Sequence, residues 1–566
     1  MLVFLSGVIC YSAHFLLIEI FLIFTFFEMA EKNIFKFLII VLFFFGNSFH
    51  SFSKQRINEI YLEKKEVFDS TQSDWFFAAP LANSLHILTK DYIIEDELLF
   101  DKDDELDFDV LNETERNLRH LKLFTSVKIE IDSVNEYLTN VYITTRDIWS
   151  TTPSILFGTG GNQTNWGGKI EEHNFLGIGT SILLEALHRS ENNIGWQGRV
   201  EVFQRRLFRT EFSLLGSLLA HKYRTEQDLS FYKPFRTLAT EWSYGFIGKN
   251  HFGNDFKYDS NQYELMQFHE RNVIAWLSRS WRRKDRVFAT AAIELNDVNR
   301  GQPEFRRAYD NTGRIYLAFS SVSENYIKTN NLNQWQDEDL PIGGWGTAIL
   351  GRTFAYKPGG EGLYYVGGQG EKSYLWNDLY LFGQITGASS FRRSDGVNTY
   401  EEFMGLAFYK ASKDMVLAAR VRQQSVWNWD GLRQLVLDND FGLRGYEVNK
   451  LSGDNRIIAN LEYRYFPDFN IWFMKVGGAL FWDGGTVWNQ TVDLGKTRWH
   501  NSIGFGLRLQ NMKSTGPTSI FRIDFAFNFD ERKFGSIIFT SDQLFSVFKK
   551  HGFRLPEMFG TEFDYE

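Results

Sequence analysis

Residues 521–529 read Phe-Arg-Ile-Asp-Phe-Ala-Phe-Asn-Phe, with an aromatic or aliphatic side chain at every odd position. The even positions hold Arg522, Asp524, Ala526 and Asn528. Because successive side chains of a β-strand point to opposite faces, this segment predicts a strand with one apolar face and one mostly polar face. Its length is close to that of a tilted strand that crosses a membrane.

The same alternation returns in two neighbouring segments. In residues 456–465 the apolar side chains occupy odd positions and polar ones, including Glu462, occupy even positions, with Ile458 as an exception. Residues 502–510 set Ile503, Phe505, Leu507 and Leu509 against Ser502, Arg508 and Gln510. A strand between lipid and a polar lumen shows this pattern, and so does a strand of a water-facing sandwich.

Period-two patterning broken by polar and Gly-rich turns extends over residues 150–545. The export signal, the low count of 9 prolines and the family resemblance given below favour an all-β transmembrane barrel over a sandwich in this range. At about 25 residues for each strand and its loop, the range accommodates about sixteen antiparallel strands. The long polar stretches 322–341 and 388–401 are expected to form extracellular loops, and residues 546–566 a C-terminal tail.

The composition is compatible with a barrel and excludes some alternatives. Aromatic residues make up 17% of the chain, yet the mean hydropathy is −0.29, because half of each barrel strand must be polar. The formal net charge of −9 provides no basic surplus for nucleic acid. With Cys10 as the single cysteine, a disulfide framework and a cysteine metal site are excluded.

The N-terminal region has the form of an export signal. Apolar residues 37–45 follow the basic residues Lys32 and Lys36 and precede Ser51-Phe-Ser53, which has small residues at the two positions that a signal peptidase reads. We predict a signal peptide over residues 29–53, translated from Met29 and cleaved near Ser53.

Residues 1–28 are then a non-native upstream extension. A second apolar stretch, residues 16–27, leaves open a two-helix inner-membrane hairpin, although both stretches are short for spanning a membrane.

A small α+β domain is expected over residues 54–149, in the order β-α-α-β-β. Pro80 suits the first position of its first helix, and Asn112 is a candidate N-cap for the second. The expected elements are a strand over 56–69, helices over 80–88 and from 112, and strands over 126–132 and 137–145. Residues 115–131 resemble the second helix and following strand of a POTRA domain, the periplasmic module of outer-membrane assembly factors.

Several motifs resemble the superfamily of BamA/TamA-type assembly factors and two-partner-secretion transporters, also known as bacterial surface antigens. Phe-Gly-Leu-Arg-Gly-Tyr at 441–446 is similar to the tip of the long loop that folds back into the lumen in that family. Residues 457–465 resemble the next family strand, and 479–488 the Phe-x-Asp-x-Gly-x-Val-Trp strand. Gly516-Pro517 before Phe521 resembles the penultimate strands, and residues 171–179 the Glu-x-Asn-x-x-Gly-x-Gly element.

This resemblance implies a lumen loop over residues 437–452 with Arg444, Gly445 and Tyr446 at its tip. The arginine remains charged and needs a carboxylate partner inside a lumen. By resemblance those partners are Asp483 and Glu462. Glu462 occupies an even position, like Arg456 and Arg464, and therefore lies on the polar face of its strand. Alternation does not assign Asp483 to the polar face as clearly, because the apolar Phe481 and Val487 lie on the same face.

The resemblance further implies an outer-membrane insertase or translocase. Its POTRA domain, in the periplasm, receives unfolded outer-membrane or secreted client proteins and periplasmic or lipoprotein accessory partners, while its barrel contacts the lipid bilayer. No motif of catalysis or nucleotide binding is present, so we expect no enzyme, no cofactor and no metal. Two alternatives are a two-partner-secretion transporter of one dedicated partner and a passive porin or surface antigen.

Overall fold

A computed structural model shows the fold of most of the chain. The predicted upstream extension and signal peptide, residues 1–53, and the Gly516-Pro517 motif lie outside the residues that it describes. The described residues are 55–67, 86–237, 239–259, 262–281, 285–335, 337–393, 395–471, 474–511, 520–541, 543–546, 553–561 and 563.

The elements before the barrel follow the predicted order β-α-α-β-β, and their three strands pair in the order β1-β3-β2. Their bounds are β1 Arg56–Lys65, α4 Asp91–Glu95, α5 Phe108–His120, β2 Phe124–Ser133 and β3 Leu138–Asp147.

The chain divides into two compact units. In the smaller one, Arg56 N donates to Tyr137 O at 2.8 Å and Ile57 N donates to Asp104 O at 2.9 Å. The larger one contains α4, α5 and the whole barrel. The smaller unit comprises the described part of Met1–Tyr61 with Asp101–Asp107 and Ile131–Val141, and the larger comprises Leu62–Phe100, Phe108–Glu130 and Tyr142–Glu566.

Both helices differ from their predicted bounds. The described end of the expected first helix, residues 86–88, is not helical. Beside it, His86 Nε2 lies 3.2 Å from the buried carboxylate of Asp147, and Thr89 N donates to that carboxylate at 2.8 Å. The second helix starts before Asn112, with Asp109 favouring its first turn. Within the described residues, no helix has the length and apolar character needed to cross a membrane.

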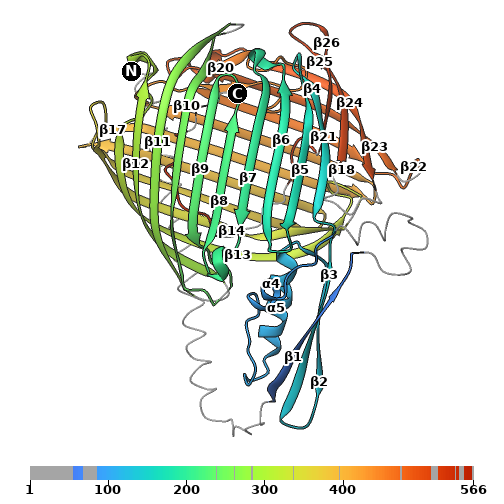
Figure 1. Ribbon diagram of the computed structural model, residues 1–566. Helices are drawn as coiled ribbons and strands as arrows, with labels where there is room; N and C mark the ends of the chain where they lie inside the picture. The colour runs from blue at the N-terminus through green and yellow to red at the C-terminus, as the bar shows by residue number, and fades with distance from the viewer. Residues whose placement is uncertain are drawn as a thin grey trace, which may run out of the picture. The chain divides into compact units, whose positions relative to one another are not determined.

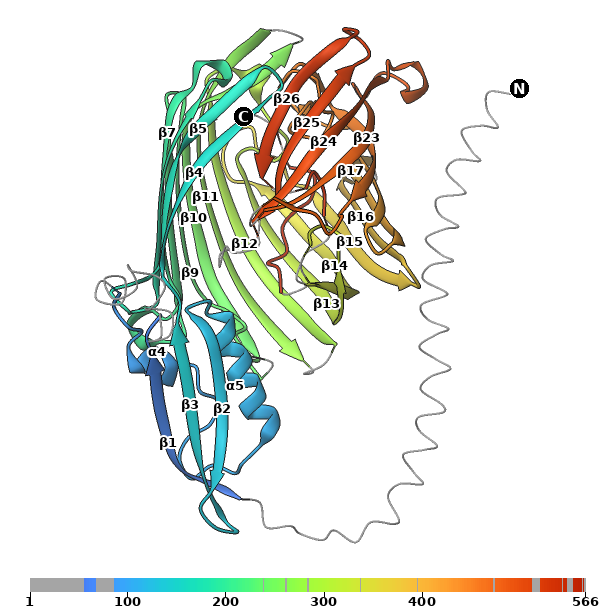
Figure 2. The ribbon, with the colours of Figure 1, turned by 90° about the vertical axis from the view of Figure 1, so that its right-hand side faces the viewer.

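Twenty antiparallel strands of the described residues close into a barrel (Figures 1 and 2), and the two-residue strand β22 Asn470–Ile471 extends its wall. The strands are β4 Thr151–Gly160, β5 Gln163–Phe175, β6 Thr180–Arg189, β7 Gly195–Gln204, β8 Ser213–Ala220, β9 Arg224–Lys233, β10 Trp242–Asp259, β11 Gln262–Trp281, β12 Arg286–Arg300, β13 Thr312–Asn330, β14 Asp337–Ala355, β15 Tyr364–Trp376, β16 Leu379–Arg392, β17 Asp395–Ser412, β18 Met415–Trp427, β21 Asn455–Tyr465, β23 Met474–Trp488, β24 His500–Asn511, β25 Ile520–Asn528 and β26 Lys533–Ser541.

The predicted number of sixteen strands is therefore wrong. Both stretches expected as extracellular loops are mostly strand: 322–341 is the end of β13 and the start of β14, and 388–401 belongs to β16 and β17. Because consecutive strands run in opposite directions, the β13–β14 turn lies at the end of the barrel where β4 begins. That end is opposite to the one expected for an extracellular loop. Polar and glycine residues interrupt the apolar positions of these strand ends, so the period-two signal is weak there.

The outer face of the barrel changes from apolar to polar between two neighbouring rows of outward-facing residues. Directly paired positions of β9, β10, β11 and β12 form rows across the sheet. One row is Gln227, Asn250, Arg271 and Asp297. The next two rows are Leu229, Gly248, Val273 and Leu295, then Phe231, Phe246, Ala275 and Ile293. Exposed apolar side chains of this kind form a lipid-facing band, and the polar row marks its edge.

Among the described strands of the wall, the last and the first share the fewest register pairs, and we call this pairing the seam. β26 and β4 share the single register pair Phe539–Thr159, whereas β4 and β5 are paired along ten positions. Figure 2 shows β26 next to the first strands on this side. Fewer backbone groups of these two strands are therefore paired with each other than in the other neighbouring strands described.

Ile293→Arg is expected to destabilise the barrel by about 2–4 kcal/mol, because it places a charge within the apolar band. Asn299→Arg is the matched control: it lies farther out on the same strand, beyond the polar row, and should cost about 0–1 kcal/mol. Urea titration of the faster-migrating, unboiled form on a detergent gel measures both costs. Equal costs would contradict the assigned edge of the band.

Candidate functional site

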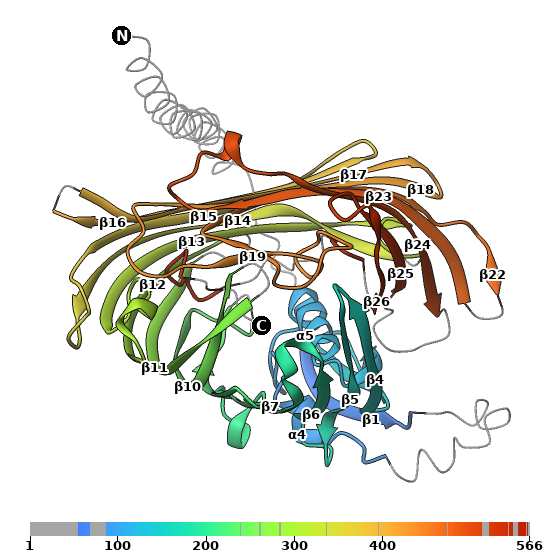
Figure 3. The same ribbon diagram turned by 90° about the horizontal axis from the view of Figure 1, so that it is seen from above.

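The connection between β18 and β21, residues 428–454, folds into the barrel from the end opposite Thr151. Its short strands β19 Leu435–Leu437 and β20 Leu451–Gly453 pair with each other. Val448 N donates to Gly161 O at 3.1 Å, and Ser452 Oγ donates to Tyr258 O at 3.0 Å. Seen from above, the orange loop lies within the ring of strands (Figure 3). The loop thus contacts the first half of the barrel as well as its own neighbours.

Arg444 at the loop tip is fully buried among three carboxylates. Its Nε and Nη2 donate to the two oxygens of Asp483, both at 2.8 Å. Its Nη1 donates to Glu462 at 2.7 Å and to Asp524 at 3.0 Å. This combination of one bidentate and two single charge-assisted contacts fixes both the position and the orientation of the guanidinium.

Phe481 completes the surroundings of the arginine. The guanidinium carbon lies 3.5 Å from the centre of the Phe481 ring, a close cation–π contact. The sequence alone did not decide whether Asp483 faces the lumen, because the apolar Phe481 lies on the same face of β23. Both side chains face the lumen, and the phenyl ring belongs there because it stacks on Arg444.

Further arginines surround these carboxylates. Arg464 Nε donates to Glu462 at 2.8 Å and Arg508 Nη1 donates to Asp524 at 2.6 Å, while Arg522 Nε lies 3.4 Å from Asp524. Among the described residues, four guanidiniums therefore face three carboxylates. Burial alone would lower the pKa of Arg444, but the charges of Asp483 and Glu462 outweigh burial and raise it.

Gly445 and Tyr446 place the loop tip against the wall. Gly445 has a φ of +86°, and a Cβ there would lie 3.0 Å from the Cβ of Ala526, so a larger residue is both strained and crowded. The Tyr446 ring is buried, and its hydroxyl donates to Asn501 O at 3.0 Å. The tip is thus held by a salt bridge, a close backbone approach and an aromatic anchor.

Asp438 joins the two limbs of the loop. Its Oδ1 accepts from the backbone N–H groups of Asp440 and Phe441, both at 3.0 Å, and its Oδ2 accepts from Asn449 N–H at 2.8 Å. Burial raises the pKa of the Asp438 carboxyl to about 6, although these backbone donors act in the opposite direction.

The structure brings together all five residues that the sequence singled out: Arg444, Gly445, Tyr446, Asp483 and Glu462. Sequence reasoning missed Asp524, Arg508 and Phe481 as members of the same cluster. For Asp524 and Arg508 a signal was present, because both occupy the polar positions of alternating segments. Which polar residues of different strands meet depends on the strand register, and the sequence does not specify it.

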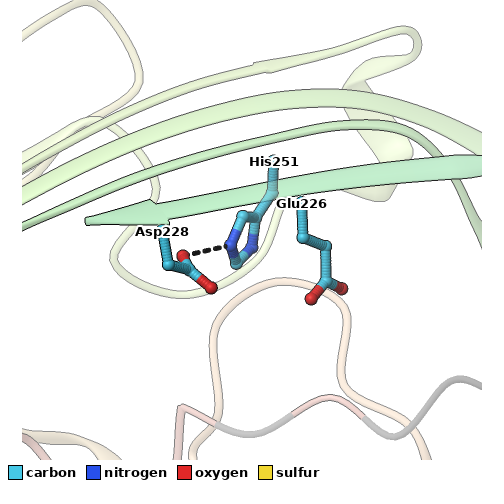
Figure 4. A group of neighbouring side chains, drawn as sticks. All are labelled: Glu226, Asp228 and His251. Atoms are coloured by element: carbon cyan, nitrogen blue, oxygen red, sulfur yellow. Dashed lines mark hydrogen bonds and ion pairs between the residues drawn. The ribbon is translucent and has the colours of Figure 1, made fainter. Parts of the chain in front are cut away.

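Glu226, Asp228 and His251 have the spacing of metal ligands, with ligand atoms within 4.8 Å of one another (Figure 4). They lie on β9 and β10. His251 Nε2 is 2.8 Å from Asp228 Oδ1, and Glu226 forms an ion pair with Arg224 at 2.6 Å. Because an arginine already binds one of the carboxylates, we assign these residues to the ion pairs of the wall.

A closed antiparallel barrel with an apolar outer band and a loop bound inside by buried charges defines a transmembrane β-barrel with an inserted lumen loop. Residues 412–538 match the family model described as "Omp85 superfamily domain", and this part of the chain is an Omp85 superfamily domain. This match confirms the predicted resemblance to the BamA/TamA-type superfamily over these residues. The matched residues include Arg444 and all three of its carboxylate partners.

Solved structures show distant similarity. The chain is 14% identical to BamA from Haemophilus ducreyi lacking POTRA domains 1–3, with a TM-score of 0.42 over 85% of this chain and 84% of that one. It is 11% identical to CdiB from Acinetobacter baumannii, with a TM-score of 0.41 over 86% of this chain and 74% of that one. It is 10% identical to CdiB from Escherichia coli, with a TM-score of 0.41 over 86% of this chain and 76% of that one. No curated protein sequence matches the chain.

Arg444→Ala is expected to release the loop tip and to cost about 3–5 kcal/mol, because it removes the ion-pair partner of the buried Asp483. Asp483→Ala should cost less, since Arg444 keeps Glu462 and Asp524. Limited proteolysis between residues 440 and 450 measures loop release, and urea titration measures stability. Arg199→Ala, in an exposed ion pair with Glu201 of the same strand, is the control and should change neither. The double variant should be no worse than Arg444→Ala; additive losses would show that the residues act separately.

The loop is expected to become less mobile as the pH falls from 8 to 5. A carboxyl whose pKa is raised by folding stabilises the folded state at low pH, and this contribution is lost as the pH rises from about 4 to about 6. A nitroxide at position 447 reports loop mobility in its spectrum. Asp438→Asn should flatten the pH dependence, and an unchanged dependence in that variant would rule out Asp438 as its source.

Proposed function

We propose that this protein inserts client β-proteins into the outer membrane or exports them across it, without cofactor or fuel. The observation that carries the proposal is the buried contact of Arg444 with Asp483 inside an Omp85 superfamily domain. A loop bound in this way holds the lumen in a defined arrangement, which a passive pore does not require.

The sparse pairing of the seam supports a lateral route for clients. When β26 and β4 separate, each exposes unpaired N–H and C=O groups, and in lipid such groups need partners. A client strand that pairs with the open edge satisfies them and gains its own main-chain hydrogen bonds. The exchange supplies the free energy of insertion, so that no nucleotide is needed.

We assign the elements before the barrel to a single POTRA domain in the periplasm. In the sheet order β1-β3-β2, strand β2 is an edge, and it is exposed over most of its length. Edge strands of this kind bind extended segments by β-augmentation. Unfolded clients or periplasmic and lipoprotein accessory partners are the expected ligands.

A disulfide across the seam tests the lateral route. In the Thr159→Cys/Phe539→Cys variant, oxidation should abolish the folding of a urea-denatured outer-membrane β-barrel client in proteoliposomes, and reduction should restore it. Client folding is measured by its gel mobility before and after boiling. Leu381→Cys/Ala407→Cys, a directly paired position of β16 and β17, is the matched control and should leave the rate unchanged. Equal client folding with the seam closed would favour the passive porin.

A further inference from the structure

Part of the lumen wall is apolar, which is unusual for the polar interior of a large barrel. The inward-facing side chains of β11 to β18 form one buried cluster there. Its members include Trp276, Tyr316, Ile349, Tyr365, Tyr400 and Val426. Such a surface is stable in a wet lumen only if something covers it.

The segment after the last strand covers this surface. Met558 is buried in the cluster, and Leu555 and Phe559 pack against it. Tyr316 Oη donates to Pro556 O at 2.9 Å, and Phe559 N donates to Tyr365 Oη at 2.9 Å. Figure 2 shows the red C-terminal chain inside the wall of strands. Side chains of the wall therefore bind the backbone of the segment as well as its side chains.

Charge and ring contacts fix the register of the segment. Arg554 forms a bidentate ion pair with Glu371 at 2.8 and 3.1 Å, and its guanidinium lies 5.0 Å from the Trp345 ring. The Phe553 ring lies 4.9 Å from Phe235. At the far end, Arg307 stacks on the Phe563 ring at 3.7 Å.

Gly560 shows how closely the two surfaces fit. It has a φ of +81°, and a Cβ at this position would lie within 2.6–2.9 Å of the Tyr400 ring. Arg433 donates to its carbonyl oxygen. The backbone acceptors, the arginine, the aromatic side chains and the glycine of the segment are all matched, either by the wall or by the connections that adjoin it, as in a preformed peptide site.

We propose that the lumen wall of β11 to β18 is a peptide-binding groove whose resident ligand is residues 553–561 with Phe563. Its ligands are peptide segments that carry an arginine next to an aromatic residue and further apolar side chains beyond it. The resident segment plugs the lumen. A client segment of the same chemistry displaces it during passage, and this last step rests on the proposed function.

A chain that ends at Ser546 tests the groove. It should bind a fluorescein-labelled synthetic peptide of residues 553–563, whereas the full chain should not. In planar lipid bilayers the shortened chain should conduct more than the full chain, and the peptide should reduce its conductance. Equal conductance of the two chains, or equal peptide binding, would overturn the proposal.

Charge reversal tests the register. Glu371→Arg in the shortened chain should weaken peptide binding by roughly thirtyfold or more, and a peptide with Arg554→Glu should restore it. No loss, or no rescue, would show that the peptide binds elsewhere.

If the shortened chain does not fold, a nitroxide at position 558 of the full chain replaces it. The label should be immobile, should become mobile in Arg554→Glu, and should be immobile again in Arg554→Glu/Glu371→Arg. Mobility that does not change between these variants would overturn the proposal. None of these measurements uses a client, so their failure is distinct from failure of the seam experiment.

Discussion

A guanidinium stays charged even where water is excluded, and the interior of this barrel is arranged around that constraint. Arg444 is buried, so carboxylates from β21, β23 and β25 must converge on one point of the lumen. These carboxylates in turn need Arg464 and Arg508, because three acidic groups cannot be buried together without compensation. The position of one loop is thereby coupled to the register of the last strands.

The lumen has two walls of different chemistry, and each holds a different part of the chain. Charged side chains of β21 to β25 hold the loop, whereas aromatic side chains of β11 to β18 hold the C-terminal segment. Both walls are built from inward-facing alternate positions, so the same period-two pattern encodes both. What distinguishes them is the choice of arginine and carboxylate on one wall and tyrosine and tryptophan on the other.

Alternation in segments such as 521–529 predicted the strands, and together with the export signal and the family resemblance it predicted a barrel. The Arg-Gly-Tyr motif with the two strand motifs that follow it predicted the central site residues. The strand number was not predictable in the same way, because polar and glycine residues interrupt the alternation at the ends of β13, β14, β16 and β17. Asp524 and Arg508 join the site through strand register, which depends on the closed sheet as a whole. The aromatic residues of the tail gave no periodic signal, since their partners are far away in the sequence.

The seam pair Thr159–Phe539 also has a consequence for biogenesis. About 380 residues separate these two positions, so the ring closes through one of the longest-range pairings in the chain. Folding rates fall as contacts become less local, and β4 keeps an open edge until the last strand has been synthesised. Until the ring closes, the unpaired edge of β4 is a site at which other chains can pair, so slow closure favours aggregation of the unfinished barrel.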